Sequence, residues 1–120
     1  MSNGLELSDY LDDIITAITD TAEFTQGMSF EIFAADKKTV NVVIRCLEII
    51  GEATKHIPIS LRKKHPDLPW SNMAGMRDVL IHDYMGVDDY MGVDLKTVWK
   101  VAQERLPELK PLLVGLKTDL

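Results

Sequence analysis

Apolar side chains recur at intervals of three and four residues along most of the chain, and this spacing restricts the fold to helices. The first series consists of Leu11, Ile14, Ile15, Ile18 and Ala22. Such spacing places apolar side chains on one face of an α-helix. No segment stands out with the alternation that a half-buried strand requires. We therefore predict an all-α fold, an antiparallel bundle of four to five helices.

Glycine and proline residues divide the pattern into helical segments. The first is expected over about 8–26, before Gly27, a typical residue after a helix end. The second is expected over about 29–57 without interruption, and Pro58 ends it. Because its apolar residues form two stripes, this long helix is predicted to be central and is a candidate dimer face.

The second half of the chain predicts two further helices. One begins near Trp70 and runs to Tyr84, and the next begins at Leu95. Two prolines, Pro107 and Pro111, are expected to bend or restart the last helical segment.

Composition narrows the class of protein. The 120 residues predict a single domain, 1–120, and the net charge of −6 by itself counts against a nucleic-acid binder. Cys46 is the only cysteine, so no disulfide within the chain is expected and a reducing, cytoplasmic setting fits best. Because charges interrupt its most apolar run, VNVVIRCLEIIG, no membrane span is expected.

A cluster of chemically active residues lies in the segment MRDVLIHDY, residues 76–84. Arg77 can bind a phosphate through its planar, permanently charged guanidinium group. His82 can exchange a proton near neutral pH, and Asp78, one helical turn earlier, could orient the imidazole. These groups suit metal-independent RNA cleavage, in which the ribose 2′-hydroxyl attacks the adjacent phosphodiester. Taken alone, this spacing is more often that of a surface arginine and a packed histidine.

Helix geometry adds a constraint on this pair. Arg77 and His82 are five residues apart, which separates them by about 140° on a straight helix. Either the helix end is distorted, or two copies of the helix pool their residues. The second arrangement predicts a site at a dimer interface.

Several longer stretches resemble one family. They are GMSFEIF at 27–33, KKTVNVVIRCLEIIGEATKHIP at 37–58, HPDLPW at 65–70, GMRDVLIHDYMGVD at 75–88 and VDLKTVWKVAQERLPELK at 93–110. Together they resemble the HepT-type branch of the HEPN superfamily, small helical ribonucleases that are the toxin halves of HepT–MntA toxin–antitoxin pairs. The resemblance covers most of the chain.

The resemblance implies a homodimeric HEPN bundle with endoribonuclease activity and an RNA substrate. Arg77 and His82 would be the catalytic residues of two motifs that line one cleft. The implied partner is an MntA-like minimal nucleotidyltransferase antitoxin, which would transfer AMP to Tyr84. An adenylyl group beside Arg77 would add bulk and negative charge and would repel RNA.

Two acidic residues of the long helix, Glu48 and Glu52, are candidates for orienting Arg77 or His82. The alternative is that they belong to a solvated ladder of ion pairs. Five basic residues are candidates for binding RNA, although a lone basic run is more often a solvated turn. These are Lys37, Lys38, Arg62, Lys63 and Lys64. No metal site and no cofactor are expected, since no set of residues has metal-ligand spacing.

The six residues DYMGVD occur twice in succession, at 83–88 and 89–94. The first copy preserves the spacing of Arg77, His82 and Tyr84. We interpret the second copy as an insertion, absorbed as a longer loop with Gly86 and Gly92 supplying flexibility. A continuous helix from 70 to 93 would contradict this interpretation. The insertion also brings Tyr90, a second candidate for AMP transfer, and leaves open whether activity is impaired.

Two functions from different classes remain at this point. The first is an endoribonuclease toxin that acts through Arg77 and His82. The alternative is a non-catalytic HEPN-like module that binds nucleotide, RNA or a nucleotidyltransferase partner. The intact pair of Arg77 and His82 favours the enzyme.

Overall fold

The computed structural model describes residues 3–76, 89–90 and 93–120. The helices before residue 77 are α1 (Asn3–Phe24), α2 (Phe30–Ala35), α3 (Lys37–Lys55), α4 (Ile59–Lys64) and α5 (Trp70–Ala74). The later elements are the strands β1 (Asp89–Tyr90) and β2 (Val93–Asp94), α7 (Leu95–Lys100), the π-helical turn η1 (Val101–Arg105) and α8 (Leu106–Thr118). Apart from one pair of two-residue strands, the described chain is helical, and the prediction of an all-α fold is confirmed.

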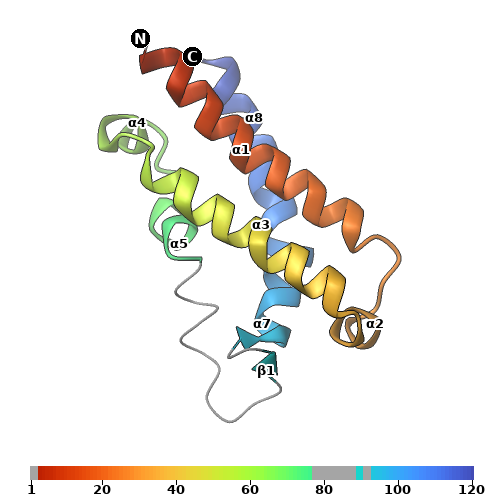
Figure 1. The fold of residues 1–120 in the computed structure, drawn as a ribbon. Coiled ribbons are helices and arrows are strands. Elements are labelled where there is room, and N and C mark those ends of the chain that lie inside the picture. Colours follow the sequence, from red (N-terminus) through yellow and green to blue (C-terminus); the bar gives the residue numbers. More distant parts are fainter. Residues whose placement is uncertain (1–2, 77–88, 91–92) are drawn as a thin grey trace.

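The longest helices form an antiparallel bundle. Helix α3 returns along α1, and α8 runs back toward the beginning of α1, so both chain ends lie at one end of the molecule (Figure 1). Fully buried side chains from all three helices, among them Leu11, Leu47 and Leu113, make up the core. At the shared end, Lys117 forms an ion pair with Asp12. None of the described helices combines the length and the hydropathy needed to cross a membrane.

The predicted long helix over 29–57 is wrong in one respect, because the chain breaks at Asp36. This residue has an extended backbone (φ −103°, ψ 90°), closes α2 and caps the first turn of α3. One carboxylate oxygen accepts a hydrogen bond from the Thr39 backbone amide at 3.2 Å, and the other accepts one from its hydroxyl at 2.9 Å. Such capping satisfies amides that a helix start leaves unpaired, and so it favours two helices over one.

The end of α1 agrees with the prediction, whereas its start does not. The helix begins at Asn3 rather than near residue 8 and ends at Phe24. Gly27 follows with φ +78°, a left-handed conformation that glycine adopts at little cost. The turn between α1 and α2 therefore depends on this glycine.

The carboxy-terminal helical run passes through both prolines, contrary to the expected restart. Pro107 lies in the first turn of α8, where its missing amide costs little, and Pro111 lies inside the helix. The helical hydrogen-bond pattern changes earlier, in η1, where the Leu106 amide donates to the Val101 carbonyl five residues before it. Within this turn Gln103 also donates a side-chain hydrogen bond to Thr25 of α1, at 2.9 Å.

The second copy of the repeat is not part of a helix. Strands β1 and β2 pair antiparallel, with Asp89 opposite Asp94 and Tyr90 opposite Val93. This extended backbone excludes a continuous helix from 70 to 93, the result that would have contradicted a loop at this position. The interpretation of the second copy as an insertion stays a prediction. After the second copy, Trp99 of α7 still packs against Phe33, with ring centroids 5.1 Å apart.

Candidate functional site

The predicted catalytic segment follows directly after α5. Four residues of the predicted site, Arg77, Asp78, His82 and Tyr84, lie outside the described residues, and their roles stay predictions. Tyr90 lies in β1, and its role as an acceptor also stays a prediction. Helix α5 begins at Trp70 as expected but ends at Ala74, so the predicted helix over 70–84 is interrupted at Gly75.

A groove of about 430 Å³ lies at the end of α5, beside Met76, the residue that precedes Arg77. Its apolar surface comes from separate parts of the chain: Leu47 of α3, Met73 and Met76, and Val101 and Leu109 on the run from η1 to α8. Met73 is fully buried, and Met76 and Leu109 are nearly so. The groove thus has a rigid apolar floor built from the bundle core.

Polar side chains of three kinds line the same groove. Asn72 supplies an amide, Arg105 a guanidinium group and Glu108 a carboxylate, and all three residues are exposed. Within the described part of the chain, neither Arg105 nor Glu108 has an ion-pair partner. The groove therefore combines apolar contact with a hydrogen-bond donor, an acceptor and a free positive charge. These residues were not predicted from the sequence, since they are far apart in the chain and match no motif.

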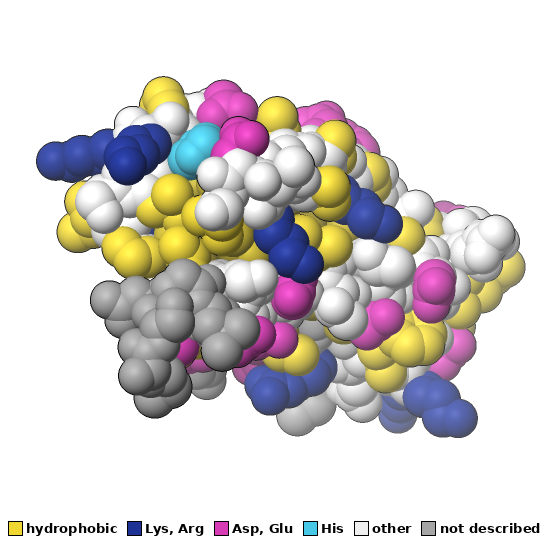
Figure 2. Space-filling view, turned by 90° about the horizontal axis from the view of Figure 1, so that it is seen from above, with side chains coloured by type: hydrophobic (Ala, Val, Ile, Leu, Met, Phe, Trp, Pro, Cys, Tyr) yellow, Lys and Arg dark blue, Asp and Glu magenta, His cyan; other side chains and the backbone are white. Residues whose placement is uncertain are grey.

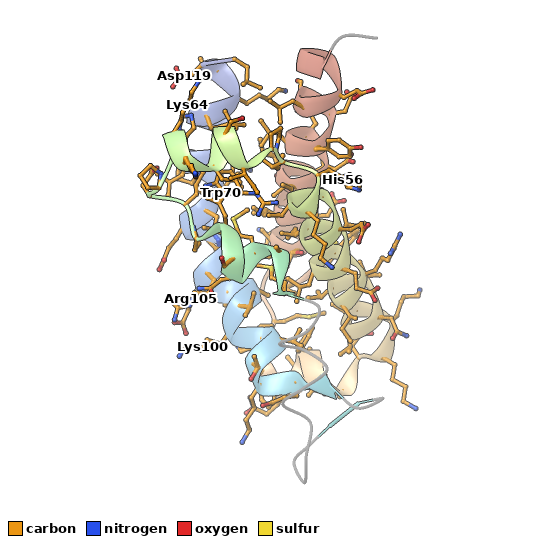
Figure 3. The ribbon with its side chains drawn as sticks, turned by 90° about the vertical axis from the view of Figure 1, so that its left-hand side faces the viewer. His56, Lys64, Trp70, Lys100, Arg105 and Asp119 are labelled. Carbon is orange, nitrogen blue, oxygen red and sulfur yellow. The ribbon has the colours of Figure 1, made fainter. Side chains whose placement is uncertain are left out.

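The π-helical turn aligns two basic side chains. Residues five apart are about 140° apart on an α-helix, whereas a π-helix bonds residues five apart and brings them toward one side. Lys100 and Arg105 are separated by this interval, across η1. In Figure 3 both side chains project from the same side of the helical run. Lys100 and Arg105 therefore form a basic edge, and Arg105 also lines the groove.

The predicted supporting carboxylates lie on α3, and the described contacts of each are local. The carboxylate of Glu48, about one third exposed, is 3.8 Å from the Arg45 guanidinium group. Glu52 is largely exposed, and its carboxylate is 3.8 Å from Nε2 of His56. Glu52 also lines a smaller hollow of about 190 Å³ between α1 and α3, where Tyr10 stacks on His56 with ring centroids 4.7 Å apart. That hollow shares no lining residue with the groove, and the supporting roles of Glu48 and Glu52 stay predictions.

The five predicted RNA-binding residues do not form one patch. Lys37 and Lys38 begin α3, whereas Arg62, Lys63 and Lys64 are in α4, beyond its other end (Figure 1). The 19 residues of α3 separate the two groups by about 28 Å. On the face seen in Figure 2, acidic and basic side chains are likewise interspersed.

Arg62 differs from its basic neighbours because its guanidinium group has structural partners. Its Nε donates to the Ile57 carbonyl at 2.9 Å, and its Nη2 donates to the Thr54 carbonyl at 2.8 Å. The Thr54 carbonyl is in the last turn of α3 and the Ile57 carbonyl lies just beyond it, a region where a positive charge is favourable. Lys63 and Lys64 are exposed and have no such contacts among the described residues.

Cys46 is buried in the core, as its place in an apolar stripe predicts. Burial raises the pKa of its thiol, because the charged thiolate is poorly solvated there. Among the residues that the structure describes, no group of three or more His, Cys, Asp or Glu side chains could hold a metal ion.

Comparison with known proteins adds independent information. The family model described as "Ribonuclease HepT-like" matches residues 14–114. "Probable ribonuclease HepT" of Thermococcus cleftensis is 51% identical over 102 residues, which cover 85% of this chain and 87% of the relative. "Putative RNase MJ0125" of Methanocaldococcus jannaschii is 45% identical over 115 residues, covering 96% and 94% of the two chains.

A bacterial relative shows a similar match. "Putative RNase TTE0752" of Caldanaerobacter subterraneus subsp. tengcongensis is 40% identical over 101 residues, which cover 84% of this chain and 85% of the relative. No solved structure matches the chain. The family model spans most of the chain, and the relatives align over most of their own length. The chain therefore belongs to the HepT-like ribonuclease family.

Proposed function

We propose that this protein is a metal-independent endoribonuclease and the toxin of a toxin–antitoxin pair. The observation that carries the proposal is the family match over residues 14–114, which includes Arg77 and His82 in the arginine–histidine motif. The names of the relatives support RNA as the substrate. A cytoplasmic setting is part of the proposal.

The chemistry requires two groups at one phosphodiester. His82 accepts the proton of the ribose 2′-hydroxyl, whose oxygen attacks the adjacent phosphorus while the bond to the 5′ oxygen breaks. Arg77 binds the phosphate oxygens and stabilises the charge that develops on them. The leaving 5′ oxygen takes up a proton from solvent, so the products are a 2′,3′-cyclic phosphate and a free 5′-hydroxyl group. We further propose that two copies of the chain contribute their motifs to one cleft.

The test is cleavage of RNA in the presence of EDTA by the wild-type protein and the His82→Ala and Arg77→Ala variants. We expect cleavage by the wild type and a loss of at least about 100-fold in each variant. This is the scale of a missing proton acceptor for His82→Ala and of missing charge stabilisation for Arg77→Ala. The His65→Ala variant is a matched control that should keep its activity. Equal cleavage by wild type and His82→Ala would show that His82 is not the catalyst, and absence of cleavage throughout would favour the non-catalytic binding module.

Regulation by a nucleotidyltransferase antitoxin is a second part of the proposal. The partner would transfer AMP from ATP to the Tyr84 hydroxyl, releasing pyrophosphate, and the added phosphate would compete with RNA for Arg77. Peptide mapping after incubation with the partner and ATP tests this step, with Tyr84→Phe and Tyr90→Phe compared. AMP on Tyr84, and its loss only in Tyr84→Phe, is expected. Modification confined to Tyr10 or Tyr90 would contradict it.

A further inference from the structure

The groove beside Met76 has a size and lining suited to one nucleotide. Pockets for small ligands begin at about 300 Å³ and combine apolar walls with a few polar groups. This groove encloses about 430 Å³ and is lined by Met73, Met76 and Leu109, with Asn72, Arg105 and Glu108 among its polar residues. A flat nucleobase can bury one face against such an apolar floor, which is favourable for any base.

We propose that this groove binds a guanine nucleotide of the RNA substrate, adjacent to the bond that is cut. The inference rests on the proposed ribonuclease function and adds a site for base recognition. Met76 lines the groove and immediately precedes, in the chain, the segment that carries the predicted catalytic residues. The adjacent phosphates follow the basic edge of Lys100 and Arg105.

Glu108 is the residue that favours guanine. A carboxylate offers two acceptor oxygens and no donor when ionised. Guanine alone among the four bases presents two neighbouring donors, N1–H and the exocyclic N2 amine, on its pairing edge. Adenine, cytosine and uracil each present a single donor group there. A paired contact of this kind discriminates between bases by about tenfold or more.

Arg105 has a different role in the groove. It is exposed, lines the groove and has no ion-pair partner among the described residues, so its guanidinium group is available for a phosphate. A phosphate contact contributes affinity without sequence preference and increases the dependence of binding on salt. Arg105 therefore contributes affinity for any RNA, whereas Glu108 contributes the preference for guanine.

The test measures binding without cleavage. Pentanucleotides UUGUU, UUIUU (inosine, which lacks the N2 amine) and UUAUU, all 2′-O-methylated, cannot be cut because the attacking hydroxyl is blocked. We expect UUGUU to bind about tenfold more tightly than UUAUU, with UUIUU between them. In protein labelled with ¹³C at the methionine methyl groups, the Met73 and Met76 signals should shift on binding. The Met28 signal is the internal control, since Met28 does not line the groove.

Matched variants separate the two roles. Glu108→Gln should bind UUGUU and UUAUU within about twofold of each other, because an amide offers only one acceptor. Glu104→Gln removes a neighbouring exposed carboxylate outside the groove and should keep the preference. Arg105→Gln should weaken both oligonucleotides equally and lower the slope of log affinity against log salt by about one.

The results distinguish this inference from the proposed function. Equal affinity for UUGUU and UUAUU in the wild type, an unchanged preference in Glu108→Gln, or unshifted Met73 and Met76 signals would each overturn the groove proposal. If the wild type cleaves unmodified RNA while one of these results is found, the ribonuclease proposal stands and the groove proposal fails. Guanine-selective binding without any cleavage would support the groove as a binding site and contradict the ribonuclease proposal.

Discussion

The contacts of Arg62 predict a structural role that can be separated from RNA binding. The Arg62→Ala variant loses two charge-assisted hydrogen bonds to carbonyls at the end of α3. Bonds to charged groups contribute about 1.5–3 kcal/mol each when buried. Arg62 is only half-buried, and the Thr54 carbonyl also accepts from the Ile57 amide at 3.0 Å, so water and existing partners compensate in part. We expect a loss of about 2 kcal/mol in the free energy of unfolding.

Urea unfolding followed by far-UV circular dichroism measures this loss. For a chain of this size it corresponds to a decrease in Tm of roughly 6–10 °C. Arg62→Lys should recover about half of the stability, because an ammonium group lacks the fork that reaches both carbonyls. Lys63→Ala is the matched control, and an exposed side chain of this kind should change stability by less than about 0.5 kcal/mol.

Two outcomes would refute the reasoning. One is an unfolding free energy of Arg62→Ala within about 0.5 kcal/mol of wild type, the range of ordinary surface substitutions. The other is equal destabilisation by Lys63→Ala. RNA affinity measured well below the Tm of each variant then shows whether Arg62 also contacts RNA, since the folded populations are equal there.

Three further predictions concern the backbone, a cap and the core. Gly27→Ala should destabilise the protein by about 1 kcal/mol because this residue has a positive φ. Gly115→Ala should stabilise it by about 0.5–1 kcal/mol, because Gly115 lies inside α8 and a methyl group there meets open space. Thermal unfolding of the two variants measures both effects. Hydrogen bonds from Thr39 lower the pKa of Asp36. The ionised carboxylate therefore contributes to the free energy of unfolding above about pH 4, and this contribution is lost as the pH falls through the pKa of Asp36 in the folded state. Acid unfolding of Asp36→Asn should therefore be shallower than that of wild type, and identical acid limbs would contradict the cap. The buried Cys46 thiol should react with a thiol reagent at pH 8 only at the rate of unfolding, and fast labelling of the native protein would contradict its burial.

The spacing of the apolar residues predicted the helical fold correctly, because it follows from the burial of one face of each helix. Gly27 likewise marked the end of α1, since its positive φ is a local requirement. The break at Asp36 escaped prediction because Ala, Asp and Lys are all compatible with a helix, and only the side-chain contacts with Thr39 favour two helices. The expected restart at Pro111 does not occur, because α8 continues through this residue.

The sequence indicates only those residues of the candidate site that are close together in the chain. Arg77 and His82 are five residues apart and match a family motif, so the sequence alone indicates them. The groove joins Leu47, Met73 and Arg105, which come from three separated segments. Without a motif, their proximity follows only from the packing of α3, α5 and η1. Residues that such long-range contacts bring together can be identified only from the structure.

The pairing of β1 with β2 also bears on how such a gene can change length. The second copy of DYMGVD begins at Asp89 and ends at Asp94, and these two residues face each other across the ladder. Paired Cα atoms lie about 5 Å apart, whereas six extended residues would span about 20 Å. Because the first and last residues of the unit are paired, the unit lengthens the chain without moving the start of α7 away. Because the two ends of the unit lie side by side, we expect in-frame duplication or loss of a whole unit at this position to leave the bundle core in place.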